Sequence, residues 1–301
     1  MRVVKSWMID DFLPVADATY AALERQLGIN IVTPYSLLEF HATPEIHNTY
    51  RERALQTSYL TEYPDTASLD PYFNFNFGIS EISPCSIIDM RSLQNAWRTA
   101  LQESGSLLEE KFDWSQLNAT SGGITYKGIT AKKLICCEGS AAMENPYFSL
   151  LPFALNKGEV LIADIPDLPR THIFKHHLKI TPWEDGLSWV GSSFDWKYTD
   201  LLPSETFRAK AEQQLESWLK IPFSIKEHWA ASRPATVDHK PFTGFHPLHP
   251  AIGILNGMGA KGCSQAPYFA YNMAQHLIEG TDLFAETDIK RFTKILSRTT
   301  V

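Results

Sequence analysis

The chain has 301 residues, of which 44% are hydrophobic and 12% aromatic, enough apolar material to bury a sizeable core. Its formal net charge of −7 argues against a surface that neutralises nucleic-acid phosphates, and no run of Lys and Arg offsets that charge. No apolar stretch approaches the roughly 18 residues of a membrane-spanning helix, and the first residues lack a secretory signal pattern. We therefore expect a cytoplasmic protein without a nucleic-acid partner and without a membrane span.

Helical spacing of apolar residues begins near Phe12 and is clear in four segments. The first segment is followed by Gly28 and the second by Gly105, and glycine readily adopts the left-handed conformation that ends a helix. The polar segment 44–55 is also expected to be helical. The four clear helices are expected at 12–27, 90–104, 204–220 and 266–278.

Alternating or continuous apolar runs predict strands between these helices. The Lys127–Gly128 pair and the Glu-Asp-Gly sequence at 184–186 are turn signals that predict hairpins. Single strands are expected at 30–42, 134–140, 158–164, 172–180 and 187–194. Because helices and strands alternate along the chain, a mixed α/β fold is expected.

The four cysteines include no Cys-x-x-Cys pair, and we interpret them as reduced core residues. The alternative is a reactive Cys263, because it lies at the start of a predicted helix, where a thiolate is stabilised. Several histidines lie close together in the sequence, but no carboxylate partner completes a set of metal ligands, so no metal is expected. These histidines are His172, His176, His177, His246 and His249.

A glycine-rich turn joins a short apolar strand to the last predicted helix. Gly257, Gly259 and Gly262 let the backbone approach a ligand closely, and the helix start supplies N–H groups and a partial positive charge. This arrangement favours an anionic or electron-rich ligand. The alternative is that the three glycines only allow the strand and the helix to pack tightly.

Two linked motifs surround this turn. The first, R-P-x-T-x-D-x-x-P-x-x-G, runs from Arg233 to Gly244, and the second, N-G-x-G-x-K-G, runs from Asn256 to Gly262 before Ala-Pro at 266–267. Together they resemble the C-terminal signature of the D-amino-acid oxidase family, which includes glycine oxidase and sarcosine oxidase. Segments 134–162 and 171–196 resemble the family's entry into the substrate domain and its substrate-domain hairpin.

The resemblance implies a fold, a cofactor and a reaction. The fold is an FAD/NAD(P)-binding, Rossmann-like domain interleaved with a mixed-sheet substrate domain. The cofactor is FAD, and the reaction is oxidation of a small amino acid or amine at a carbon–nitrogen bond by hydride transfer to the flavin. The FAD-binding domain is expected at 1–28, 84–158 and 229–301, and the substrate domain at 29–83 and 159–228.

The same resemblance assigns residues. Arg233 is expected to bind the substrate carboxylate, and Lys261 and Lys5 to lie near the flavin and the substrate. Arg233 has an alternative as a structural ion-pair partner of Asp238, and Lys261 as a solvated loop residue. The residues expected to contact the cofactor are Arg2, Gly139, Gly257, Gly259, Lys261, Gly262, Cys263 and Ser264.

One family feature is missing from the start of the chain. Members normally begin with a strand, G-x-G-x-x-G and a helix, whereas the first twelve residues, MRVVKSWMIDDF, resemble a segment that follows this unit. We therefore expect an N-terminally incomplete FAD domain, weak or absent FAD binding and an inactive chain. Ser188 stands where sarcosine oxidase has a lysine, which leaves a dehydrogenase open.

Two other functions remain open from the sequence. One is a flavin-free, non-catalytic protein that keeps the fold and binds a ligand or a partner. The other is a hydrolase that uses Cys263 as its nucleophile, although the sequence identifies no histidine positioned to serve it.

Overall fold

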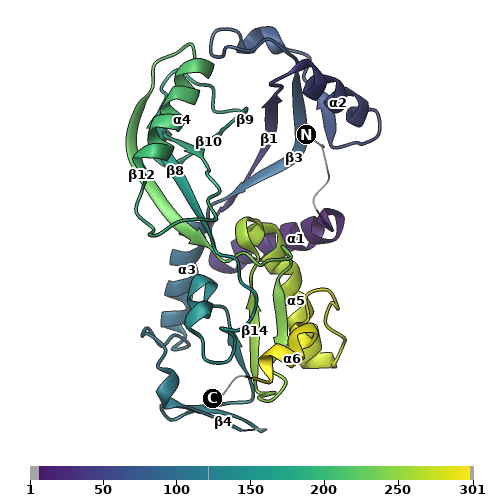
Figure 1. The fold of residues 1–301 in the computed structure, drawn as a ribbon, viewed down its shortest axis with the longest axis vertical. Helices are drawn as coiled ribbons and strands as arrows, with labels where there is room; N and C mark the ends of the chain where they lie inside the picture. The colour runs from purple at the N-terminus through teal and green to yellow at the C-terminus, as the bar shows by residue number, and fades with distance from the viewer. Residues whose placement is uncertain (1–6, 121, 299–301) are drawn as a thin grey trace. The chain divides into compact units, whose positions relative to one another are not determined.

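The computed structural model describes residues 7–120 and 122–298 and contains two compact units (Figure 1). Among the described residues, unit 1 comprises Trp7, Asn30–Met90 and Lys157–Ala231. Unit 2 comprises Met8–Ile29, Arg91–Asn156 and residues 232–298. Both units combine helices with sheets, so the predicted mixed α/β fold is confirmed. Within the described residues, no helix is long and apolar enough to cross a membrane.

Unit 1 is built on an eight-stranded sheet with the order β12-β8-β11-β10-β9-β1-β3-β2. Strand β1, an interior strand of this sheet, runs parallel to β9 and antiparallel to β3, with Val32 opposite Ile88 at one end and Phe40 opposite Ile79 at the other. The strands are β1 (Val32–Phe40), β2 (Leu60–Glu62), β3 (Ile79–Ile88), β8 (Asn156–Asp164), β9 (Ile173–Lys175), β10 (Lys179–Pro182), β11 (Ser188–Gly191) and β12 (Ser224–Arg233).

Helices α2 (Pro44–Ala54) and α4 (Glu205–Trp218) complete unit 1, with the short 3-10 segments η1 (Thr66–Leu69) and η4 (Glu184–Gly186). Thr43 and Ser204 cap the starts of α2 and α4, because their hydroxyl oxygens accept bonds from backbone N–H groups in the first turns. The core centres on the fully buried Phe73, whose ring centroid lies within 4.9 Å of those of Phe40, Phe174 and Trp218.

The expected single strand at 172–180 is wrong. The structure has two short strands there, β9 and β10, which pair antiparallel with Lys179 opposite Lys175. The backbone N–H of His176 donates to the carbonyl of Leu178 at 2.9 Å and closes the turn between them. Polar residues in the middle of the apolar run therefore mark a turn.

No group of three or more His, Cys, Asp or Glu residues is placed to hold a metal ion within the part of the chain that the structure describes.

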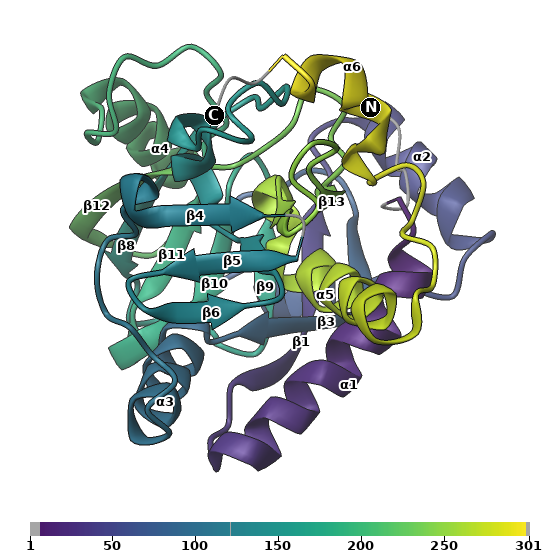
Figure 2. The same cartoon turned by 90° about the horizontal axis from the view of Figure 1, so that it is seen from below.

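Unit 2 contains two three-stranded sheets and the longest helices, α1 and α5, which are labelled in Figure 2. Helix α1 packs against α5, with the ring centroids of Phe12 and Phe269 5.4 Å apart, and α1 ends at Gly28 in the predicted left-handed conformation. The helices are α1 (Ile9–Leu27), α3 (Met90–Glu103), α5 (Gly262–Glu279) and α6 (Thr293–Leu296), with η2 (Trp114–Gln116), η3 (Gly139–Glu144), η5 (Gly259–Lys261) and η6 (Ile289–Phe292).

The two sheets of unit 2 have different characters. One is the antiparallel meander β4 (Leu117–Thr120), β5 (Gly123–Tyr126) and β6 (Ile129–Ala131), in which Lys127 and Gly128 form the predicted hairpin turn with positive φ. The other has the order β13 (Phe242–Phe245), β14 (Ile252–Asn256) and β7 (Leu134–Cys136), and β14 runs parallel to β7. Within the described residues, β7 is an edge strand of this sheet.

A buried histidine predicts how stability depends on pH. His41 is 2% exposed, and its ring nitrogens lie 2.9 Å from Nδ1 of His47 and 3.1 Å from Oγ of Ser80. Burial, together with the nearby His47, lowers the pKa of His41 to about 4. In the unfolded chain the histidine has its ordinary pKa of about 6.5, so between about pH 4 and pH 6.5 the unfolded chain binds a proton that the folded chain does not. His41 therefore stabilises the fold above about pH 6.5, and this stabilisation is lost as the pH falls toward 4.

We therefore expect the free energy of unfolding to fall below about pH 6.5, with His41 contributing at most about 1.4 kcal/mol per pH unit, the linkage limit for one proton. His41→Asn should remove that part of the slope, measured by urea unfolding at a series of pH values. The matched control is His239→Asn, at an exposed position. Equal slopes for the wild type and His41→Asn would contradict the assignment.

Candidate functional site

Two parallel strands of unit 2 end side by side at one edge of their sheet. Cys136 of β7 is opposite Ile254 of β14, and each strand is soon followed by a glycine with positive φ, Gly139 at 60° and Gly257 at 84°. The side chain of Asn256 donates from Nδ2 to the carbonyl of Gly139 at 2.8 Å, and its Oδ1 accepts from the N–H of Gly257 at 2.8 Å. One amide side chain thus holds both turns at the edge where α/β sheets commonly bind ligands.

The glycines of this edge fall into two groups. A Cβ on Gly257 would lie 2.6 Å from Cγ2 of Thr236, and one on Gly259 would lie 3.3 Å from Cβ of Ala235. These two glycines therefore allow close packing, as the alternative interpretation proposes. A Cβ on Gly139 or on Gly262 would meet no other atom within 4 Å. The space beside Gly139 and Gly262 is therefore open to a ligand.

The start of α5 supplies polar groups to the same turn. Gly262 is the first residue of the helix, and the first N–H groups of an α-helix have no partner within the helix. Gln265, in the first turn, is 1% exposed, and its buried Nε2 has no hydrogen-bond acceptor among the described residues. A buried donor without an acceptor is costly, so an electron-rich ligand at this end of α5 is favourable.

The spacing of Gly257, Gly259 and Gly262 is itself G-x-G-x-x-G, placed between strand β14 and helix α5. The motif is easily overlooked at this position, because members of the family normally carry it at the start of the chain. A complete dinucleotide-binding unit also needs a second parallel strand after the helix. The residues described after α5 contain only η6 and α6, so the turn supplies the strand, the glycines and the helix of such a unit without its second strand.

Arg233, the last residue of β12, lies beside the glycine turn. Its Nη1 donates to Oδ1 of Asn156 at 2.8 Å, and the N–H of Gly259 donates to the carbonyl of the next residue, Pro234, at 3.0 Å. Desolvation lowers the pKa of Arg233, which shows a cation partly withdrawn from water. Asn156 is 1% exposed, and its Nδ2 has no hydrogen-bond acceptor among the described residues.

Asp238, the ion-pair partner of Arg233 in the alternative interpretation, has other contacts. Oδ2 of Asp238 lies 3.1 Å from Nη2 of Arg291, and Oδ1 of Asp238 accepts from the N–H of Lys240 and from the hydroxyl of Thr236, both at 3.1 Å. Asp238 thus organises the loop that packs against Gly257. These contacts explain the aspartate of the first motif as a structural residue.

The remaining predicted cofactor contacts differ in their surroundings. Lys261 is exposed in η5, and its own N–H already donates to the carbonyl of Met258 at 3.0 Å. The carbonyl of Cys263 accepts from the hydroxyl of Tyr20 at 2.8 Å, and desolvation raises the pKa of the Cys263 thiol, which opposes the reactive thiolate that a hydrolase would need. The hydroxyl of Ser264 donates to the carbonyl of Lys261 at 3.1 Å. Arg2, a predicted cofactor contact, and Lys5, predicted to lie near the flavin and the substrate, lie outside the described residues.

Glu138 is a further polar residue at this edge that the sequence interpretation missed. It stands between β7 and Gly139, and its Oε2 accepts from Nδ2 of Asn145 at 2.6 Å. Desolvation raises the pKa of Glu138, and the bond from Asn145 opposes that effect. The sequence signal that could have identified Glu138 is an acidic residue two positions after a short apolar strand, where a carboxylate is partly withdrawn from water.

Comparisons with known proteins identify the family. The sequence profile of the "FAD dependent oxidoreductase" family, DAO, matches residues 15–276. Glycine oxidase from Bacillus subtilis (strain 168) is 34% identical over 116 residues, which are 37% of this chain and 31% of that protein. The matched part therefore spans about a third of that relative's length.

Solved structures show the same fold. Glycine oxidase from Geobacillus kaustophilus has a TM-score of 0.74 at 18% identity, and the match covers 96% of this chain and 84% of that chain. L-amino acid deaminase from Proteus vulgaris has a TM-score of 0.73 at 10% identity, covering 96% and 81% of the two chains. The expected FAD/NAD(P)-binding fold is confirmed, and with the family profile matching most of its length, the chain belongs to the family of FAD-dependent oxidoreductases, whose cofactor is FAD.

Proposed function

We propose that this protein oxidises a small amino acid or amine at a carbon–nitrogen bond, with FAD as the hydride acceptor. The observation that carries the proposal is the position of Arg233, a partly desolvated guanidinium bonded to Asn156 and joined through Pro234 to the glycine turn. The relatives named glycine oxidase and L-amino acid deaminase support an amino-acid substrate, because both names describe proteins that act on amino acids.

The residues of the turn fit FAD in chemical character. The open space beside Gly139 and Gly262 admits a ligand, and the N–H groups at the start of α5 and the buried Nε2 of Gln265 are donors for its electron-rich atoms. We assign these residues to holding FAD, with Cys263 and Ser264 contributing backbone N–H groups. When bound, FAD supplies the two-electron acceptor that takes a hydride from the substrate.

Arg233 is suited to the substrate carboxylate. A guanidinium presents a planar pair of N–H donors that matches the two oxygens of a carboxylate. Its partial desolvation makes an anionic partner more favourable than it would be for an arginine in water. Asn156 acts as a positioning residue, because its Oδ1 holds Nη1 of Arg233 at 2.8 Å. We assign Lys261 as a second cation near the same group.

The protein's contribution to such a reaction is mainly orientation. Binding the carboxylate at Arg233 fixes one end of the substrate, so that its carbon–hydrogen bond can be held in one direction. A hydride leaves with its electron pair, and the proton on nitrogen passes to solvent or to a nearby base. Glu138, whose pKa is raised by desolvation, is a candidate to hold that proton at a carboxylate oxygen.

Substitution of Arg233 tests the proposal. In the protein loaded with FAD, Arg233→Lys should lower kcat/KM for glycine and other small amino acids by about 100-fold, mainly through KM, because a bidentate contact becomes a single point charge. Amines without a carboxylate should be affected far less. Dye reduction and oxygen consumption should be followed in parallel, because Ser188 leaves the electron acceptor undecided.

The matched control for Arg233 is Arg208→Lys, at a partly exposed arginine on α4 whose contact is an ion pair with Glu212. This control should keep wild-type kinetics, since surface pairs of this kind contribute little. An equal loss with carboxylate-free amines would show that Arg233 is not the carboxylate anchor. A kcat/KM for Arg233→Lys equal to that of the wild type would also show that Arg233 is not the carboxylate anchor.

Two glycine substitutions separate packing from ligand binding. Gly257→Ala should destabilise the fold by about 1–3 kcal/mol, because its φ is 84° and its Cβ would crowd Thr236. Gly262→Ala should leave stability within about 0.5 kcal/mol, because this residue has helical φ and ψ and open space around it. The measurements are urea unfolding and the flavin absorption spectrum after removal of free FAD.

Gly262→Ala is also expected to weaken FAD binding by about tenfold if the open space receives the cofactor. Unchanged FAD binding would remove the start of α5 from the cofactor site. If neither this chain nor a version that includes the family's N-terminal G-x-G-x-x-G unit retains FAD after incubation with an excess, the alternative of a flavin-free binding protein replaces the enzyme.

A further inference from the structure

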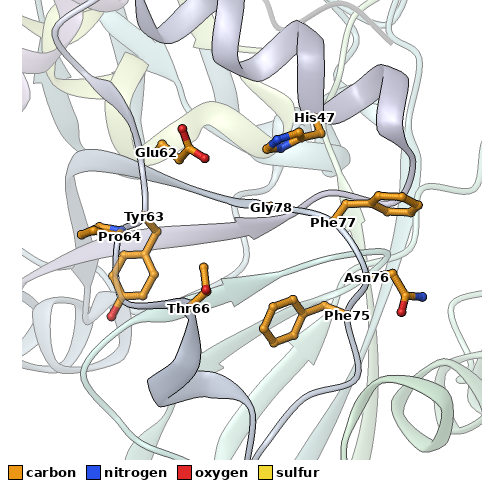
Figure 3. Close-up of a pocket in the computed structure, with 9 residues that line it drawn as sticks. All are labelled: His47, Glu62, Tyr63, Pro64, Thr66, Phe75, Asn76, Phe77 and Gly78. Atoms are coloured by element: carbon orange, nitrogen blue, oxygen red, sulfur yellow. The ribbon is translucent and has the colours of Figure 1, made fainter.

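Unit 1 contains a cavity of about 590 Å³ at one end of its sheet (Figure 3). It lies next to Gly78, at the end of β1 and β3 where Phe40 is opposite Ile79, and it shares no residue with the glycine turn. Its size is within the range of cavities that bind small molecules. The lining residues are His47, Glu62, Tyr63, Pro64, Thr66, Phe75, Asn76, Phe77 and Gly78.

Aromatic rings form one side of this cavity. Tyr63 and Phe75 flank Thr66 in Figure 3, and both rings pack against the buried core of unit 1. Phe75 makes an edge-to-face contact with Phe40, with ring centroids 5.4 Å apart and an angle of 77° between the planes. The two lining rings are thus held by the core, and the faces of such rings carry partial negative charge.

Glu62 and His47 lie on the opposite side (Figure 3). Glu62, the last residue of β2, is the only Asp, Glu, Lys or Arg among the lining residues. Its Oε2 lies 3.8 Å from Nε of Arg51 on α2, and both side chains are more than half exposed, so this pair is weak. The fixed charge of the cavity wall is therefore negative.

His47 is fixed from behind by buried groups. Gly78 has no side chain, and a Cβ there would overlap the His47 ring, so the imidazole lies directly over the backbone. Nδ1 of His47 is 2.9 Å from Nδ1 of His41, which also contacts Ser80. Because Nδ1 is engaged with His41, the remaining polar atom of His47 is Nε2, on the side of the ring away from that contact.

We propose that this cavity binds a small organic cation, with Glu62 supplying the charge and Tyr63 and Phe75 supplying ring faces. A carboxylate opposite aromatic rings is the combination that recognises ammonium groups, because the charge and the ring faces both attract a cation. Thr66 and the ring of His47 are placed to accept or donate a hydrogen bond to a polar tail. The cavity is independent of the proposed oxidation.

The experiment titrates choline into the 301-residue chain by isothermal titration calorimetry. The comparison is the uncharged analogue of choline in which carbon replaces the quaternary nitrogen. Choline should bind, and the analogue should bind at least about tenfold more weakly, because it has the shape without the charge. A quaternary ammonium has no lone pair on nitrogen, so it is not an amine substrate. Arg233→Lys should leave choline binding unchanged.

Two substitutions should change choline affinity in opposite directions. Glu62→Gln should weaken it by about fivefold or more, because the carboxylate charge is lost while its shape is kept. Arg51→Gln should strengthen it by about twofold, because the competing cation is removed from Glu62. The matched control is Glu52→Gln, which makes the same charge change at an exposed position on α2 outside the cavity.

Three results would overturn the proposal. They are no choline binding by the wild type, equal binding of choline and its uncharged analogue, and equal effects of Glu62→Gln and Glu52→Gln. None of them depends on FAD binding or on oxidation, so failure here and failure of the proposed function are distinguishable.

Discussion

The parallel pairing of β7 with β14 determines the candidate site. Parallel strands end at the same edge of a sheet, so the residues after Cys136 and after Asn256 meet there although more than a hundred positions separate them. The Asn256 side chain then joins the two turns through Gly139 and Gly257. Without this pairing, the open positions at Gly139 and Gly262 would not share an edge, and a ligand would meet only one of them.

The first motif, from Arg233 to Gly244, packs against the glycine turn at this edge. Thr236 and Ala235 occupy the space that side chains at 257 and 259 would need, and the carbonyl of Pro234 accepts from the N–H of Gly259. Arg233 is next in the chain to these contacts. The packing that places the glycine turn therefore also places the guanidinium, which is a physical reason for the two motifs to occur together in one sequence.

Local features of the fold could be predicted from the sequence, and long-range contacts could not. Glycine predicted the end of α1 at Gly28, and Lys127–Gly128 predicted a hairpin, because each depends on a few adjacent residues. The strand predicted at 172–180 failed because a turn at His176 interrupts an apolar run.

In the site, the glycine turn and Arg233 were identifiable from their motifs. The contact between Arg233 and Asn156 was not, because it joins residues 77 positions apart through the neighbouring strands β12 and β8. The cavity beside Gly78 was also beyond the sequence. Its lining comes from α2, β2 and the segment before β3, whose arrangement depends on the register of the sheet.

The division of each unit into separate stretches of chain has a consequence for synthesis on the ribosome. The sheet of unit 1 needs β12, and unit 2 needs β14 and α5, all of which come after residue 223. Neither unit can therefore complete its core until most of the chain has been translated, and apolar strands made early must wait for partners made late. For the same reason, neither unit corresponds to a single fragment that can be cut out by truncation.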